Sequence, residues 1–205
     1  YDQIVHDAAL QKLPVVFCID RAGLVGEDGP THHGVFDLAY FRQIPGVTVM
    51  APRDGHELGQ MMRFALSSSG GPVAIRYPRG AVPEEFAPFL LAEREPVLLA
   101  RSEVLRQGRD VLILALGSMV YPAYQAAALL EKEGVDAAVV NARFVKPLDT
   151  ETILEKSKGK SLVLTVEEGT LAGGFGSAVL ELFSLENAGK EAPVKVRMMG
   201  VPDHF

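Results

Sequence analysis

The chain has 205 residues, of which 48% are hydrophobic and 22% charged, and its formal net charge is -6. This composition is typical of a globular protein with enough residues to bury a core. A nucleic-acid-binding domain is expected to carry a basic face, so the acidic balance argues against nucleic acid as a partner. No apolar run approaches the ~20 residues that span a bilayer. The single cysteine, Cys18, cannot form an internal disulfide, and we expect a cytoplasmic protein with no membrane contact.

The first predicted elements are a helical segment over 1–10 and a strand over the apolar run 15–19. The continuous apolar run predicts a strand of a parallel sheet that is covered on both faces, with Cys18 as a buried thiol. A glycine-rich stretch, 20–34, follows directly. It carries four side chains suited to binding or proton transfer: Arg21, Asp28, His32 and His33. Long loops are uncommon unless functional, and open α/β sheets bind ligands beyond the carboxyl ends of strands, so this loop is the predicted site.

Helices and strands then alternate, which predicts a parallel sheet in the first part of the chain. The expected elements are a helix over 36–44, a strand over 47–50, a helix over 55–66 and a strand over 72–76. Asp54 is a good N-cap for the second of these helices. Arg76 lies within the last strand, where we expect it to pair with an acidic side chain, and Arg79 follows that strand.

A linker is predicted over 83–98, because this stretch combines prolines with glutamates. It divides the chain into a first unit, 1–82, and a second unit, 99–205, which repeats the α/β pattern. The expected strands of the second unit cover 104–107, 111–116, 137–141, 162–166 and 194–198, and its expected helices cover 120–133, 149–158 and 177–185. The predicted fold class is therefore α/β, with two units that each contain a parallel sheet.

Arg21 and Arg79 both follow strands of the first unit. Two arginines at the strand ends of one sheet can converge on one anion, and a guanidinium group matches phosphate oxygens bidentately. The alternative is that both are surface arginines paired with carboxylates. Asp28 and His32 are four residues apart, and a carboxylate that orients an imidazole raises the pKa of the ring and suits it to proton transfer. The alternative for His32 is an ordinary polar surface residue.

The segment Gly173-Gly-Phe-Gly176 precedes a predicted helix, as a phosphate-binding loop does. Glu167 and Glu168 precede it and would repel a phosphate, and no acidic residue follows at the spacing of a dinucleotide-binding motif. Close packing of the backbone is the better interpretation, and a subunit interface is one place where it could occur. His33 is expected to be structural, and no cluster has the residue spacing of metal ligands.

Several motifs resemble the transketolase superfamily of thiamine diphosphate enzymes. Gly26-Glu-Asp-Gly-Pro-Thr-His32 resembles the signature of its pyrimidine-binding domain. Asp20-Arg-Ala-Gly23 and the Arg-Tyr-Pro-Arg-Gly of 76–80 resemble the 1-deoxy-D-xylulose-5-phosphate synthase family rather than the transketolases. The segments 143–149 and 167–176 resemble the carboxyl-terminal domain of that family, so the resemblance covers the whole chain.

This resemblance implies a transferase that condenses pyruvate with glyceraldehyde 3-phosphate and releases carbon dioxide. The product, 1-deoxy-D-xylulose 5-phosphate, is a precursor of isoprenoids, thiamine and pyridoxal. The resemblance assigns Arg21 and Arg79 to the phosphate of the acceptor, Asp28 to its hydroxyl, and His32 to proton transfer near the reacting carbon. It also implies thiamine diphosphate and magnesium as cofactors, and a homodimer.

The resemblance places the family's Asp-Gly motif for the metal and diphosphate before Tyr1, together with the glutamate that activates the aminopyrimidine, so we expect both to lie outside these 205 residues. We therefore expect the chain to be the carboxyl-terminal part of a longer protein, with the cofactor ligands mainly in a missing amino-terminal part and no activity of its own. Three alternatives stay open: a transketolase, the β-type subunit of a 2-oxo acid dehydrogenase, and a non-catalytic paralogue that binds sugar phosphates.

Overall fold

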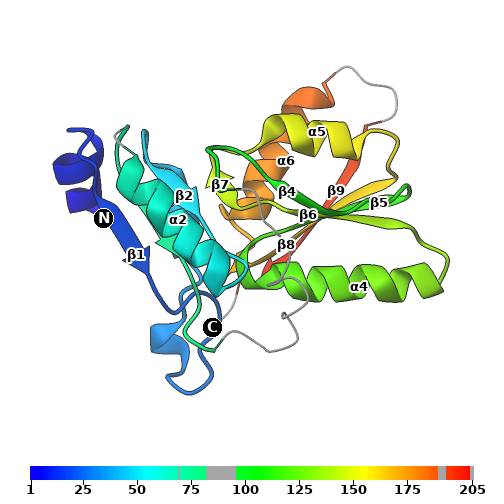
Figure 1. Ribbon diagram of the computed structural model, residues 1–205, viewed down its shortest axis with the longest axis horizontal. Coiled ribbons are helices and arrows are strands. Elements are labelled where there is room, and N and C mark those ends of the chain that lie inside the picture. The colour runs from blue at the N-terminus through cyan, green and yellow to red at the C-terminus, as the bar shows by residue number, and fades with distance from the viewer. Residues whose placement is uncertain (69, 82–95, 189–192, 204–205) are drawn as a thin grey trace.

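The computed structural model describes residues 1–68, 70–81, 96–188 and 193–203, so residues 83–95 of the predicted linker lie outside the described part of the chain. Strands and helices alternate along both predicted units and form two sheets, which confirms the α/β class (Figure 1). The amino-terminal segment is helical, as predicted, over Ile4–Ala9.

The first sheet has four strands in the order β1-β3-β2-β7. They are β1 (Val16–Ile19), β3 (Val73–Arg76), β2 (Thr48–Met50) and β7 (Phe144–Lys146). The first three are mutually parallel, as predicted. β7 runs antiparallel to β2 and comes from the second predicted unit. The sequence analysis missed β7, because three residues between two loops give no periodicity to detect.

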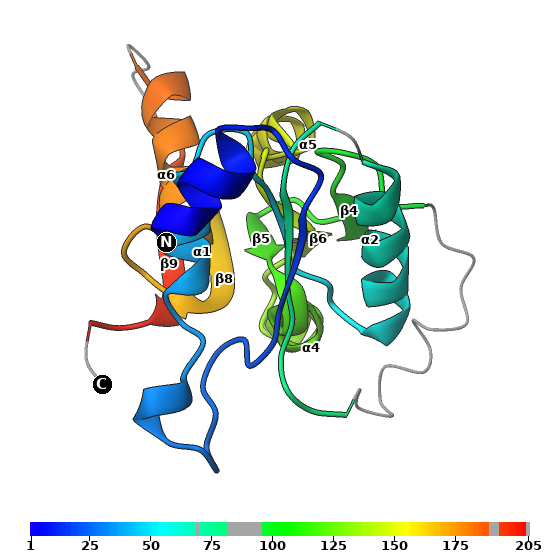
Figure 2. The ribbon, with the colours of Figure 1, turned by 90° about the vertical axis from the view of Figure 1, so that its left-hand side faces the viewer.

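Helices α1 (Asp37–Arg42) and α2 (Gly55–Ser67) cover opposite faces of this sheet (Figure 2). Alternate residues of a strand point to opposite faces, and β3 follows this rule. Val73 and Ile75 pack in one hydrophobic cluster with Met61 of α2, whereas Ala74 packs in another cluster with Leu38 of α1. Asp54 caps α2 as predicted, since its Oδ1 accepts the backbone N–H of Glu57 at 2.8 Å.

The second sheet has five strands in the order β4-β6-β5-β8-β9. They are β4 (Glu103–Arg106), β6 (Ala137–Asn141), β5 (Val111–Ala115), β8 (Leu162–Thr170) and β9 (Lys195–Val201). The helices of this unit are α4 (Val120–Lys132), α5 (Thr150–Ser157) and α6 (Phe175–Glu186). β4 runs antiparallel to β6, and the other strands are parallel. The predicted parallel pairing is confirmed in both sheets, and each sheet also has one antiparallel strand at an edge, β7 or β4.

The predicted covered strand, β1, is an edge strand, and the side chain of Cys18 is exposed. None of the β1 residues is fully buried, so the predictions of a buried strand and of a buried thiol were wrong. Within the described residues β1 pairs along one edge only, with β3, which leaves it less covered than its apolar sequence predicted.

Two clusters of buried apolar side chains each contain residues from both units. Leu38 and Phe41 of α1 lie in the same buried cluster as Leu112 of β5 and Phe175 of α6. A second cluster contains Met61 of α2 together with Val97 and Phe144 from later in the chain. The units predicted from sequence thus share their apolar interior, and the position of each sheet is fixed by the other.

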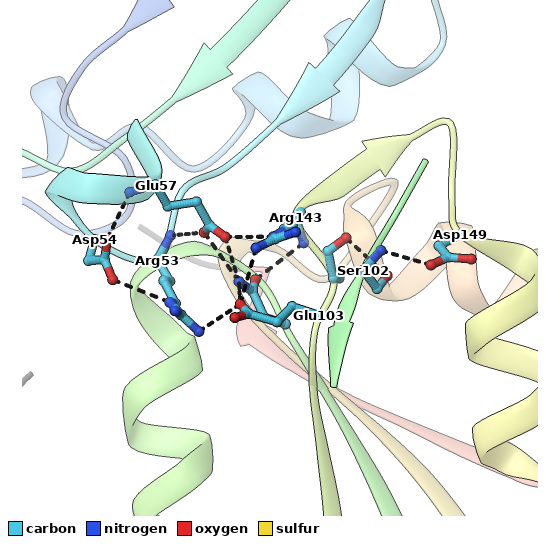
Figure 3. A network of polar contacts seen from close by, with 9 residues as sticks. Arg53, Asp54, Glu57, Ser102, Glu103, Arg143 and Asp149 are labelled. Atoms are coloured by element: carbon cyan, nitrogen blue, oxygen red, sulfur yellow. Dashed lines mark hydrogen bonds and ion pairs between the residues drawn. The ribbon is translucent and has the colours of Figure 1, made fainter. Parts of the chain in front are cut away.

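A buried polar network also joins the two sheets (Figure 3). Glu57 of α2 is 1% exposed, and its Oε1 accepts hydrogen bonds from Arg143 Nε at 2.7 Å and from Asn141 Nδ2 at 2.9 Å. Its Oε2 accepts the backbone N–H of Arg53 at 2.8 Å. The Arg53 side chain reaches Glu103 of β4 at 2.7 Å. Buried charges are tolerated when they are paired in this way.

We expect Glu57→Ala to lower the free energy of unfolding by about 3–5 kcal/mol, because it leaves Arg143 Nε, Asn141 Nδ2 and the backbone N–H of Arg53 buried without their acceptor, and Arg143 keeps only its contact with Glu103. Urea denaturation measures the effect. Glu155→Ala is the control, since Glu155 forms an exposed ion pair with Lys156, and its loss is expected to be much smaller. Equal losses in the two variants would contradict the role assigned to Glu57.

Candidate functional site

The glycine-rich loop 20–34 leaves the carboxyl end of β1 and leads to α1, and its two ends are hydrogen-bonded. The N–H of Gly23 donates to the carbonyl oxygen of Gly34 at 2.9 Å, and the N–H of Gly34 donates to that of Gly23 at 3.0 Å. A Cβ at position 34 would lie 2.2 Å from the carbonyl oxygen of Arg21, so only glycine allows this approach. The loop is therefore closed at its base.

The base of the loop is attached to the end of β3. The N–H of Tyr77 donates to the carbonyl oxygen of Ile19 at 2.9 Å, and the N–H of Ala22 donates to the carbonyl oxygen of Tyr77 at 3.1 Å. Arg21 lies between these contacts with a φ of +60°, a left-handed conformation that costs free energy in a non-glycine residue. This arrangement places Arg21 close to Arg79, two residues beyond Tyr77.

The structure brings Arg21, Asp28 and Arg79 together. Oδ2 of Asp28 accepts from Arg79 Nη1 at 2.5 Å and from Arg21 Nε at 3.4 Å. The hydrogen bond from Arg79, with a further one from Arg21, lowers the pKa of the Asp28 carboxyl group, so the group is charged at neutral pH. The two guanidinium groups thus meet at one point, and in this structure the anion between them is the protein's own carboxylate.

His32 ends a short 3-10 helix, Pro30–His32, at the exposed tip of the loop. Its Nδ1 lies 2.9 Å from Thr31 Oγ1. The contacts of the Asp28 carboxylate among the described residues go to arginines, so the expectation that Asp28 orients His32 was wrong for this structure. His33 is structural as predicted, because its Nδ1 accepts the backbone N–H of Val25 at 3.0 Å.

Arg76 pairs with acidic side chains, as predicted from its place within a strand. It is 2% exposed, and its Nε lies 3.1 Å from Asp37 Oδ2. Its Nη1 lies 3.7 Å from Glu168 Oε2, on β8 of the second sheet. A buried guanidinium group therefore lies between the two sheets, three residues before Arg79.

The glycine-rich segment before α6 does not bind phosphate, because a carboxylate already occupies the start of the helix. Oε2 of Glu167 accepts the N–H of Phe175 at 2.9 Å, and Oε1 accepts the N–H of Gly176 at 2.7 Å. A Cβ on Gly174 would lie 2.5 Å from Glu167 Oε2. Close backbone packing, the preferred interpretation, is confirmed, and the contacts that require it lie within this chain. Burial raises the pKa of Glu167.

A cavity of about 520 Å³ lies beside Arg79. Residues from both units line it, among them Tyr77, Arg79 and Leu58 from the first and Tyr121 and Gln125 from the second. The contribution of α4 was not predictable from the sequence, because Tyr121 and Gln125 belong to no local motif and reach the cavity only through the packing of the two sheets.

Both units match known protein families. Residues 1–85 match the transketolase pyrimidine-binding domain, and residues 100–204 match the transketolase carboxyl-terminal domain. The chain belongs to the transketolase family, which confirms the resemblance deduced from its motifs.

Within that family the chain is similar to the synthases of 1-deoxy-D-xylulose 5-phosphate. It is 56% identical over 205 residues to the 1-deoxy-D-xylulose-5-phosphate synthase of Gloeobacter violaceus, covering 100% of this chain and 31% of that protein. It is 52% identical over 203 residues to the synthase of Synechocystis sp., covering 99% of this chain and 31% of that protein. The chain thus spans less than a third of the length of these curated relatives.

A solved structure has the same arrangement of elements. It is described as "Split gene transketolase, inactive beta4 tetramer", where beta4 refers to that assembly and not to strand β4. Its superposition on this chain gives a TM-score of 0.86 at 35% sequence identity. The match covers 100% of this chain and 63% of that chain. None of the helices in the described residues is long and apolar enough to cross a membrane.

The raised pKa of Glu167 predicts a pH dependence of stability. Between the pKa of the unfolded chain and the raised pKa of the folded chain, the folded chain binds more protons, so acidification favours folding. Comparison of the wild type with Glu167→Gln isolates this titration. We expect the free energy of unfolding of the wild type to increase relative to that of the variant as the pH falls from neutral toward the ordinary carboxyl pKa of 4.5, by at most about 1.4 kcal/mol per pH unit. A difference that is constant with pH would contradict the assigned pKa direction.

Proposed function

We propose that this chain supplies the acceptor-phosphate site of an enzyme that condenses pyruvate with glyceraldehyde 3-phosphate. The products are 1-deoxy-D-xylulose 5-phosphate and carbon dioxide. The convergence of Arg21 and Arg79 on one carboxylate oxygen, beyond the carboxyl ends of β1 and β3, is the observation that supports this assignment. Two guanidinium groups that share one carboxylate oxygen are spaced to share one phosphate group.

The roles of the loop side chains follow from this placement. The acceptor phosphate takes the place that Asp28 Oδ2 has between Arg21 and Arg79, and the displaced carboxylate accepts a hydrogen bond from the acceptor's hydroxyl group. His32 is exposed at the tip of the loop, where its imidazole can approach a bound substrate. We assign it the transfer of a proton to the oxygen of the acceptor aldehyde as the new carbon–carbon bond forms.

Thiamine diphosphate, held through Mg²⁺, supplies the carbon–carbon bond chemistry when it is bound. The chain spans 31% of the length of the Gloeobacter violaceus synthase, and the resemblance assigns the motif for the metal and diphosphate to a part of that protein outside this chain. We therefore assign the cofactor ligands mainly to an amino-terminal part of a longer protein, and propose that this chain alone is inactive. The complete protein is proposed to be a cytoplasmic homodimer that supplies precursors of isoprenoids and thiamine.

Release of carbon dioxide tests the proposed reaction directly. The complete protein, with thiamine diphosphate and Mg²⁺, should release carbon dioxide from pyruvate when glyceraldehyde 3-phosphate is added. A transketolase, the second candidate because of the similarity to a split-gene transketolase, would instead transfer a two-carbon unit between sugar phosphates. Absence of both activities would favour a non-catalytic paralogue that binds sugar phosphates.

Arg79→Ala should raise the KM for glyceraldehyde 3-phosphate by about 10- to 100-fold, because one charge-assisted contact with phosphate contributes about 1.5–3 kcal/mol. The KM for pyruvate should stay unchanged. Arg101→Ala is a matched control, since the side chain of Arg101 is 56% exposed, that of Arg79 is 51% exposed, and each pairs with a carboxylate. An unchanged KM for the phosphorylated acceptor in Arg79→Ala would overturn the assignment of Arg79.

His32→Ala should lower kcat by about 100-fold or more, the usual contribution of a positioned acid or base, with little change in the KM for pyruvate. Steady-state kinetics of carbon dioxide release measure both constants. His56→Ala is the control, because His56 is an exposed histidine on α2. If kcat were the same in His32→Ala as in the wild type, His32 would have no part in proton transfer.

A further inference from the structure

Arg76 lies beneath the predicted phosphate site and is bonded to several segments that shape it. We propose that Arg76, supported by Glu168 of the second sheet, is a positioning residue that sets the geometry of Arg21 and Arg79 for a phosphorylated acceptor. This inference rests on the function proposed above. It assigns a role in substrate selection to two residues that do not contact the substrate.

The three nitrogens of the Arg76 guanidinium group each reach a different segment. Nη2 donates to the carbonyl oxygen of Gly34 at 2.7 Å, Nε donates to Asp37 at the start of α1 at 3.1 Å, and Nη1 lies 3.7 Å from Glu168 of β8. The side chain is 2% exposed, so water does not weaken these interactions as it does at the surface. Lysine cannot reproduce this set of contacts, because it lacks the planar arrangement of donors.

The contact with Gly34 connects Arg76 to Arg21. The carbonyl oxygen of Gly34 accepts from Arg76 and also from the N–H of Gly23, so Arg76 holds the pair of residues that closes the loop. Gly34 packs directly on the backbone of Arg21, where a Cβ would lie 2.2 Å from the Arg21 carbonyl oxygen. A shift of Gly34 therefore shifts the backbone of Arg21, which already has an unfavourable φ of +60°.

Arg79, the second arginine of the site, is connected to Arg76 through the backbone of residues 76–79. Arg79 follows Arg76 by three residues, and Tyr77 between them bonds to Ala22 at the base of the loop. The backbone segments that carry Arg21 and Arg79 are thus attached to the residue that carries the buried guanidinium group. A displacement of that group changes the distance between the two arginines and hence their fit to one phosphate.

Glu168 contributes from the second sheet. Its side chain packs under the loop, since a Cβ on Gly23 would lie 2.9 Å from Glu168 Cβ. Its carboxylate shares the Arg76 guanidinium group with Asp37. Glu168 is therefore the contact through which the carboxyl-terminal domain positions the base of the loop.

A positioning role predicts a loss of selectivity, which a loss of stability alone does not. The measured quantity is the ratio of kcat/KM for glyceraldehyde 3-phosphate to kcat/KM for glyceraldehyde, which lacks the phosphate. The complete enzyme, with thiamine diphosphate and Mg²⁺, is assayed with pyruvate as donor. We expect Arg76→Lys to lower this ratio by about tenfold or more, and Glu168→Gln to lower it by a smaller factor.

Arg143→Lys is the matched control. The side chain of Arg143 is 4% exposed, pairs with buried Glu57 and joins the same two sheets. We expect it to lower the melting temperature as Arg76→Lys does, but to leave the selectivity ratio unchanged. Equal reduction of kcat/KM for both acceptors in Arg76→Lys, so that the ratio stays at the wild-type value, would overturn the proposal. If Arg76→Lys does not fold, the ratio measured for Glu168→Gln decides in the same way.

Arg79→Ala separates the failure of this inference from the failure of the proposed function. If Arg79→Ala leaves the selectivity ratio unchanged, the phosphate site itself is wrongly assigned and both proposals fall. If Arg79→Ala lowers the ratio but Arg76→Lys and Glu168→Gln do not, the phosphate site stands and only the positioning role is wrong.

Discussion

Apolar side chains from both sheets pack into one hydrophobic core, and the geometry of the candidate site depends on this packing. Helix α1 presents Leu38 and Phe41 to the same cluster that contains Leu112 and Phe175 of the second unit. The loop 20–34 ends where α1 begins, so the core that holds α1 also holds one end of the loop. Because large-to-small changes in such a core cost several kcal/mol, the relative position of the two sheets is well determined.

Buried charges give this shared interior its specificity. Glu57 with Arg143, and Arg76 with Asp37 and Glu168, each connect one sheet to the other. An ion pair at such a position adds little net stability compared with an apolar pair, but an unpaired charge there is strongly unfavourable. Alternative packings of the two sheets that separate these charges are therefore disfavoured. The polar contacts select one arrangement among those that the apolar core alone would allow.

Local patterns in the sequence were sufficient to predict most of the helices and strands and the fold class. The alternation of apolar strands with capped helices predicted the α/β class, and Asp54 predicted the start of α2. The edges of the sheets were not predictable in this way. β7 has three residues and pairs with a strand far away in the chain, and β1 has the composition of a central strand although it lies at an edge. Both errors concern long-range pairing, which a local pattern does not encode.

Part of the candidate site was likewise predictable from local sequence, and part depends on contacts between distant segments. Arg21 and Arg79 follow strands, so the topology of a parallel sheet was enough to predict that they meet. The partner of Asp28 was not predictable from its spacing to His32, because the fold brings Arg79 closer than the neighbouring imidazole. Tyr121 and Glu168 reach the region from the second sheet, and no feature of the first unit indicates them.

The position of Asp28 between the two arginines has a consequence for small anions. Since the carboxylate is tethered to the same loop as Arg21, it competes for the guanidinium groups at a high effective concentration. Sulfate or inorganic phosphate from the surroundings must displace it without any further contact in return. A sugar phosphate brings hydroxyl and carbonyl groups that can bond to the displaced carboxylate and to the rest of the site. In the function proposed above, the loop keeps the two arginines paired with Asp28 until a ligand arrives that matches more than their charge.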